Sequence, residues 1–109
     1  MSWDVKTHYA EITTSSGYVF TSCTPAHVVR KIIGVKITNV AGSPSLVLSK
    51  VEHGSVSTWL KEQGAGELGY YDPKRPILVV QGSGNIVGYS TASGTTAGVT
   101  ITYVDDTIY

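Results

Sequence analysis

The chain has 109 residues, close to the commonest size of a single domain and enough to bury one hydrophobic core. Only 15% of the residues are charged, and eight basic residues balance eight acidic ones, so no net field attracts nucleic acid or an anionic membrane. The single cysteine excludes an internal disulfide. With no secretory signal pattern and no apolar run of membrane-spanning length, we expect a protein that is made in a cytosol and stays soluble or joins an assembly.

Alternating side chains predict strands throughout the first half of the chain. Residues 5–14 alternate, a Ser-Ser-Gly turn follows, and residues 18–22 return, which together predict a β-hairpin. Further short strands are expected at residues 45–51 and 55–60. The longest candidate strand covers residues 28–40. Its apolar side chains alternate toward one core-facing side: Val29, Ile33, Val35 and Ile37.

The second half begins with the least regular part of the chain. Residues 57–63 have moderate helix propensity, but the segment is too short for a stable helix, so strand or loop is preferred. Residues 63–76 form a long loop rich in glycine, tyrosine and proline. Residues 77–80 are a continuous apolar run that predicts a strand buried on both faces, and strands follow at 86–91 and 99–104.

Seven or eight short strands separated by turn signals, without helical periodicity, predict an all-β fold. The expected architecture is an antiparallel β-sandwich or jelly roll in one domain spanning residues 1–109. The pattern does not separate a jelly roll from an immunoglobulin-like strand order. Residues 1–4 and 105–109 are expected to be docking termini, because terminal segments that carry aromatic side chains usually dock on a domain.

Two glycine-rich patterns resemble enzyme motifs but lack the context that the chemistry needs. Residues 82–88 resemble a dinucleotide fingerprint, but the third glycine is one residue late and no helix follows to bind a phosphate. Residues 88–92 resemble a nucleophile elbow without its strand–turn–helix setting. A turn and a surface strand are the better interpretations.

Two further pairs of residues also have simpler explanations than a chemical site. Cys23 and His27 are spaced like half of a metal site, but two ligands do not close one, and a buried thiol beside a loop histidine is preferred. Asp105 and Asp106 are adjacent in an extended segment and therefore point to opposite faces. We expect no enzyme, no catalytic residue, no metal and no cofactor.

Aromatic and basic residues flank the glycine-rich loop. They are Trp59, Tyr70, Tyr71, Lys74 and Arg75. Three interpretations stay open: the rings belong to the core, they form a protein–protein contact, or they stack on a sugar face.

Six strand and turn motifs follow one another between residues 18 and 105. They are YVFT (18–21, followed by a proline), IGVKITN (33–39), LVL (46–48), PILVV (76–80, before a glycine-rich turn), IVGYST (86–91) and VTITYVD (99–105). In this order they resemble small virion structural proteins of tailed bacteriophages. Residues 64–75 depart from that group because they are richer in glycine and tyrosine.

The resemblance implies a virion protein that assembles and has no catalytic residues. Such a protein is a capsid cement or decoration protein that self-associates, most often as a trimer, and binds the major capsid protein. It can also be a tail or head–tail accessory protein. The expected interface residues are Trp3, Trp59, Tyr70, Tyr71, Lys74, Arg75, Ile108 and Tyr109. A carbohydrate-binding module that uses Trp59, Tyr70 and Tyr71 is the alternative from a different class.

Overall fold

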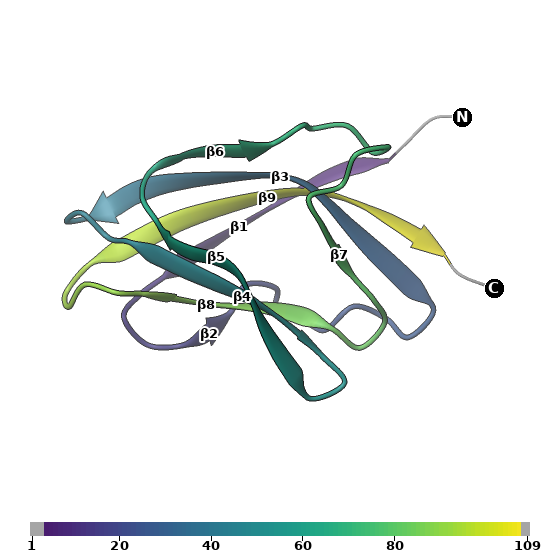
Figure 1. The fold of residues 1–109 in the computed structure, drawn as a ribbon, viewed down its shortest axis with the longest axis horizontal. Helices are drawn as coiled ribbons and strands as arrows, with labels where there is room; N and C mark the ends of the chain where they lie inside the picture. Colours follow the sequence, from purple (N-terminus) through teal and green to yellow (C-terminus); the bar gives the residue numbers. More distant parts are fainter. Residues whose placement is uncertain (1–3, 108–109) are drawn as a thin grey trace.

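The computed structural model describes residues 4–107, which form two antiparallel sheets packed face to face (Figure 1). The first sheet contains, in spatial order, β1 (Val5–Ile12), β9 (Thr96–Thr107), β3 (Val28–Ala41) and β6 (Gly66–Gly69), and β7 (Leu78–Val80) also pairs with β3. The second sheet contains, in spatial order, β2 (Gly17–Tyr18), β8 (Asn85–Ser90), β4 (Leu46–Glu52) and β5 (Ser55–Gln63). The predicted β-sandwich is confirmed.

The pairing order identifies the sandwich as a jelly roll. β6 and β7 pair with successive parts of one edge of β3, so they act as a single interrupted edge strand. Counted that way, the nine strands become eight. β1 pairs with β9, β2 with β8, β3 with the interrupted strand and β4 with β5, so the first strand pairs with the last and each later pair lies inside the one before. This nested pairing is the jelly-roll order, which decides between the two alternatives that the sequence left open.

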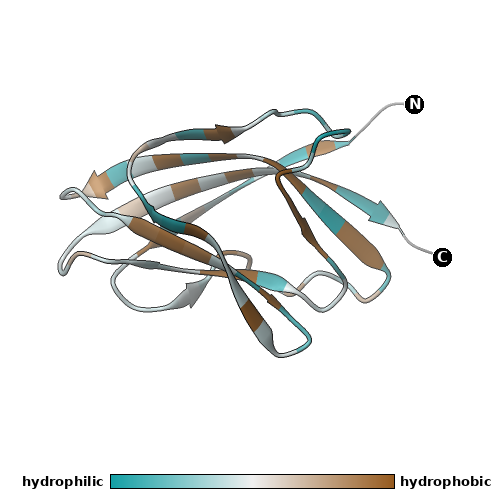
Figure 2. Cartoon of the chain, viewed as in Figure 1, coloured by the Kyte–Doolittle hydropathy of each residue, from teal (hydrophilic) through white to brown (hydrophobic). Residues whose placement is uncertain are grey.

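The inner faces of the two sheets enclose one hydrophobic core. Figure 2 shows apolar residues alternating with polar ones along β3 and β9, as expected for strands with one face against a core. The fully buried aliphatic side chains come from both sheets, and they include Ile32, Leu46, Leu48, Ile86, Val99 and Ile101.

The predicted hairpin between residues 5–14 and 18–22 is wrong. β1 pairs with β9 in the first sheet, whereas the short β2 pairs with β8 in the second. The turn at residues 15–17 therefore carries the chain from one sheet to the other. Val19 and Phe20, which follow β2, become buried between the sheets, and this burial outweighs the local turn preference.

A β-bulge in β3 changes which residues face the core. Ile32 pairs with Tyr103 and Gly34 with Thr102, so Ile33 is the extra residue. Ile32, and not Ile33 as predicted, therefore joins Val35 and Ile37 in the core cluster. Val29, predicted on the same face, is also displaced from it, because the bulge reverses the alternation between the two parts of the strand.

Four other expectations need correction. Residues 66–69 form strand β6 where a loop was predicted, because their backbone pairs with β3. Leu78 and Val79 are only half-buried, since β7 lies at a sheet edge. Cys23 is exposed and not a buried thiol. The last strand, predicted to end at residue 104, continues to Thr107, because residues 105–107 pair with β3.

Candidate functional site

A loop of residues 70–76 interrupts the edge strand formed by β6 and β7. The Tyr71 N–H donates to the Ile33 carbonyl (2.9 Å), and the Ile77 N–H donates to the Ile32 carbonyl (2.8 Å), so both ends are fixed at the bulge of β3. At the tip, the backbone and side-chain oxygens of Asp72 accept hydrogen bonds from the N–H groups of Arg75 (2.8 Å) and Lys74 (3.0 Å). This is a β-turn, for which aspartate followed by proline is a favoured sequence.

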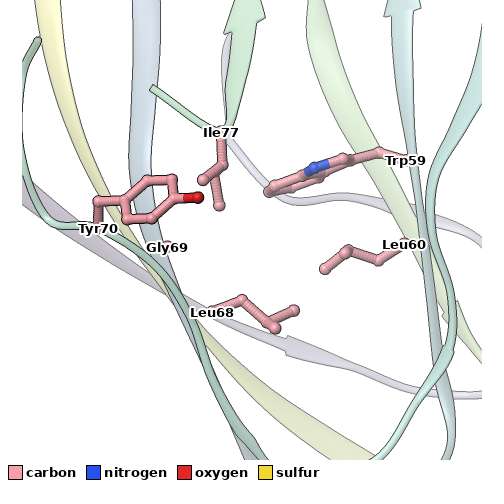
Figure 3. Close-up of a pocket in the computed structure, with 6 residues that line it drawn as sticks. All are labelled: Trp59, Leu60, Leu68, Gly69, Tyr70 and Ile77. Atoms are coloured by element: carbon pink, nitrogen blue, oxygen red, sulfur yellow. The ribbon is translucent and has the colours of Figure 1, made fainter. Parts of the chain in front are cut away.

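Beside this loop lies a hollow of about 310 Å³ between the edges of the two sheets. Its lining residues come from β5, β6, the start of the loop and the residue before β7, as Figure 3 shows: Trp59, Leu60, Leu68, Gly69, Tyr70 and Ile77. The walls are aromatic and the remaining surface is almost entirely aliphatic. A hollow of this size and character is in the range of small-ligand and side-chain binding sites.

The polar groups at the hollow are few, and none is engaged with another side chain in an ion pair or hydrogen bond. Neither the Tyr70 hydroxyl nor the Trp59 indole N–H has a hydrogen-bond partner within residues 4–107. The guanidinium of Arg75 lies 3.8 Å from the centroid of the Tyr70 ring, in a cation–π arrangement. Tyr70 is 60% exposed, so this rim is open to a partner.

Tyr71 lies away from the hollow, although it is adjacent to Tyr70 in sequence. Its ring packs over Gly34 of β3, and the side chain is 43% exposed. Partial burial, together with the negative charge of Glu67, raises the pKa of Tyr71 above its ordinary value. Trp59, Tyr70 and Tyr71 therefore do not form the continuous platform predicted from the sequence; only the first two face a common space.

The remaining predicted site residues divide into two groups. Lys74 is exposed at the loop tip, next to Arg75. Trp3, Ile108 and Tyr109 lie outside the described residues. The prediction missed the aliphatic residues of the hollow, and no local sequence signal marks them, because β5 and β6 belong to different sheets and meet only through the jelly-roll pairing.

A second cluster centres on Arg30 of β3, inside the sandwich. Its guanidinium lies over the rings of Phe20 (4.4 Å) and Tyr103 (4.6 Å) and pairs with both carboxylate oxygens of Asp105 (2.8 and 3.0 Å). His8 stacks on Phe20 with ring centroids 4.6 Å apart, and its Nε2 lies 2.6 Å from the Val19 carbonyl oxygen. The members contact one another, so the cluster ties the segment after β2 to the first sheet.

Asp105 and Asp106 point to opposite faces, as predicted. Asp105 pairs with Arg30 and Asp106 with Lys31. Across residues 4–107, no three histidine, cysteine, aspartate or glutamate side chains gather closely enough to hold a metal ion. In the same part of the chain, no helix has the length and apolar character needed to cross a bilayer.

Comparison with known proteins supports the fold. No protein-family model and no curated protein matches this sequence. Among solved structures, the chain resembles a pilus subunit of Bacillus endospore appendages, with a TM-score of 0.55 and 10% identity over 99% of this chain and 88% of that one.

Two other solved structures are less similar. The nucleoplasmin-like N-terminal domain of Drosophila FKBP39 has a TM-score of 0.49 and 13% identity over 96% of this chain and 93% of that one. The capsid protein of extra small virus particles from the giant freshwater prawn has a TM-score of 0.39 and 15% identity over 100% and 82%. None of the three comes from a bacteriophage.

Proposed function

We propose that this chain is a structural protein of a bacteriophage particle, of the capsid cement or decoration type. It self-associates, with a trimer as the favoured state, and binds the major capsid protein. A position in the tail or at the head–tail junction is the variant of the same proposal. In either position the protein is part of the virion and acts through surface burial, without chemistry.

The observation that carries this proposal is the distribution of exposed apolar side chains. Among residues 4–107, eight large hydrophobic residues are exposed, and they lie on several strands of both sheets and on the loop: Val5, Tyr9, Tyr18, Val40, Val56, Tyr70, Tyr71 and Tyr89. Five of them are tyrosines, which are enriched in protein contacts. A protein that binds one partner needs one such face, whereas a subunit in a repetitive assembly needs several.

Low charge and fold likeness support the same proposal. Few charged residues oppose the burial of this surface, since only 15% of the chain is charged. The pilus subunit with a similar fold belongs to an assembly described as disulfide-linked. This chain has one cysteine, so disulfides alone cannot connect each subunit to two neighbours, and its assembly must depend on noncovalent contacts.

Light scattering coupled to size exclusion tests the proposal on the purified chain. We expect a trimer, which fits the threefold positions of a capsid. A ring of about five, six or twelve copies would place the protein at a vertex or in the tail. A monomer that persists at high concentration would contradict self-association.

A second candidate function is sugar binding at the hollow. It is favoured by an indole N–H and a phenol hydroxyl on the two aromatic walls, neither of which has a hydrogen-bond partner in the described part of the chain. Titration with a glycan panel, monitored by tryptophan fluorescence, tests this function. A response that the Tyr70→Ala variant loses would support it, and no response to any glycan would count against it.

A further inference from the structure

We infer that the hollow is the receptor for Trp3 of a second copy of this chain, with Asp4 of that copy pairing with Arg75 at the rim. The inference rests on the proposed self-association and names the two surfaces that make the contact. It is argued from the chemistry of the hollow, the distribution of unpaired charges and the reach of the chain.

The lining of the hollow favours an aromatic side chain over a sugar. Ile77 lies between the two aromatic walls, and Leu60 and Leu68 add aliphatic surface on the other side of the hollow (Figure 3). A sugar in this space would leave hydroxyl groups without partners, which costs free energy. An indole would bury its apolar rings there. The free donors of Trp59 and Tyr70 would bond to backbone carbonyls of the incoming segment.

Charge complementarity points to the segment that carries Trp3. Within residues 4–107, Arg75 has no carboxylate within ion-pair distance, and its guanidinium contacts only the Tyr70 ring. The Asp4 side chain is 87% exposed, and its ion pair with Lys6 is long, at 3.9 Å. Trp3 and Asp4 thus supply an aromatic ring and an available carboxylate side by side, which is what the hollow and its rim lack.

The other aromatic-bearing terminal segment fits less well. The carboxylates that precede Ile108 and Tyr109 are already used within the fold. Asp105 is bound to Arg30, and Asp106 lies 2.6 Å from the ammonium of Lys31. Both aspartate side chains that precede these two aromatic residues are therefore already paired, whereas Asp4 directly follows Trp3 and is exposed.

Strand β1, which follows Trp3 in the sequence, and the hollow lie at opposite edges of the first sheet. β1 and β7 are separated by β9 and β3 in the first sheet, so three strand spacings, about 14 Å, lie between them. Trp3 is only two residues before Val5, the first residue of β1, and two residues span at most about 7 Å. This separation favours a second copy as the source of the occupant.

The two surfaces lie at opposite edges of the first sheet, which makes the contact head-to-tail. Each subunit would donate its Trp3 segment at the β1 edge and receive one at the edge formed by β6 and β7. Such heterologous contacts close into rings when the rotation permits, and a three-membered ring is the simplest that matches the proposed trimer.

Light scattering of the full chain tests the inference with variants of Trp3, of the hollow and of the charge at its rim. We expect Trp3→Ala, Tyr70→Ala and Arg75→Glu each to weaken association by at least about tenfold, as central interface residues do, while the circular dichroism spectra stay those of the wild type. Lys61→Glu is the matched control, because Lys61 is an exposed residue of β5 outside the lining of the hollow. Asp4→Lys combined with Arg75→Glu is expected to restore the assembly.

A mixing experiment tests the head-to-tail arrangement. The Trp3→Ala variant keeps a receptor, and the Tyr70→Ala variant keeps a donor, so a mixture of the two should give 1:1 dimers and nothing larger. If the wild-type chain assembles and all these variants assemble equally well, the inference is wrong and the proposed function stands. A monomeric wild-type chain overturns both, and glycan binding without any change in mass assigns the hollow to a sugar.

Discussion

The ring of Tyr71 fills the space into which a β-carbon on Gly34 would project. Gly34 follows the bulged residue of β3, and the Tyr71 N–H bonds to the carbonyl of that residue, Ile33. Because Gly34 has no side chain, the Tyr71 ring can pack directly on β3 and hold the loop that borders the hollow. The tyrosine side chain and the missing β-carbon are two parts of one contact.

This contact predicts a compensating pair of mutations. Gly34→Ala should displace the Tyr71 ring and lower the free energy of unfolding by about 1–3 kcal/mol, because the added methyl overlaps the ring. Tyr71→Ala introduced into the Gly34→Ala variant should recover part of that loss. Urea unfolding of the two single variants and the double variant measures the coupling. Additive losses would show that the two positions are independent.

Gly69 is predicted to tolerate substitution less well than Gly34. Its φ is +111°, and a β-carbon there would meet the backbone of Ile33 and Gly34, which cannot move aside as a side chain can. Gly69→Ala should therefore cost about 3 kcal/mol or more. Gly64→Ala is the control, since no atom lies within 4 Å of a β-carbon at that position. Equal melting temperatures for the two variants would contradict this expectation.

Asn85 is predicted to be a main polar determinant of stability. Its buried amide accepts from the N–H groups of Phe20 (3.3 Å) and Ile86 (2.7 Å) and donates to the carbonyl of Phe20 (3.0 Å). Asn85→Ala leaves these backbone groups without partners and should cost about 2–3 kcal/mol in urea unfolding. The exposed Asn39→Ala change should cost less than about 0.5 kcal/mol.

We predict that the ionised Glu52 side chain stabilises the fold at neutral pH and that this contribution to the free energy of unfolding is lost in acid. Burial disfavours its charge, but the Gln81 N–H, the Lys50 ammonium at 3.0 Å and the charge of His53 together lower the pKa of Glu52 below its ordinary value. Because the folded-state pKa is the lower one, the ionised carboxylate stabilises the fold above about pH 4.5, and this contribution disappears as the pH falls further.

The test compares the wild type with Glu52→Gln across pH. The difference in free energy of unfolding should be largest near neutral pH and should shrink below about pH 4.5. The exposed Glu62→Gln variant should track the wild type at every pH. A difference between wild type and Glu52→Gln that stays constant from neutral pH to acid would rule out this role for the carboxylate.

Local patterns in the sequence predicted the class of fold and most of its strands, because alternation depends only on which side chains face the core. The same patterns gave the wrong face for Val29 and Ile33. A bulge is set by pairing with β9, a strand some 70 residues away, and leaves no mark in local periodicity. The hairpin prediction failed for a related reason, since the partners of β1 and β2 lie at the far end of the chain.

The candidate site was predicted in part. Trp59, Tyr70 and Arg75 were identified because aromatic and basic residues beside a flexible segment are conspicuous in any sequence. Leu60, Leu68 and Ile77 were not, since an aliphatic residue in a strand carries no sign that it lines a hollow. Tyr71 was grouped with Tyr70 by adjacency, but the chain turns at Tyr71, whose φ is +54°, and the Tyr71 ring packs over Gly34.

The interrupted edge strand makes the loop tip a natural point of insertion. Register on one side is fixed by the pairing of Gly34 with Gly69 and on the other by that of Ile32 with Leu78, so extra residues between Pro73 and Lys74 shift no strand. The chain can therefore carry a foreign peptide at the rim of its sandwich without re-registering the sheet. Because Arg75 follows Lys74 directly and belongs to the proposed contact between copies, an insertion here would change association without changing the fold.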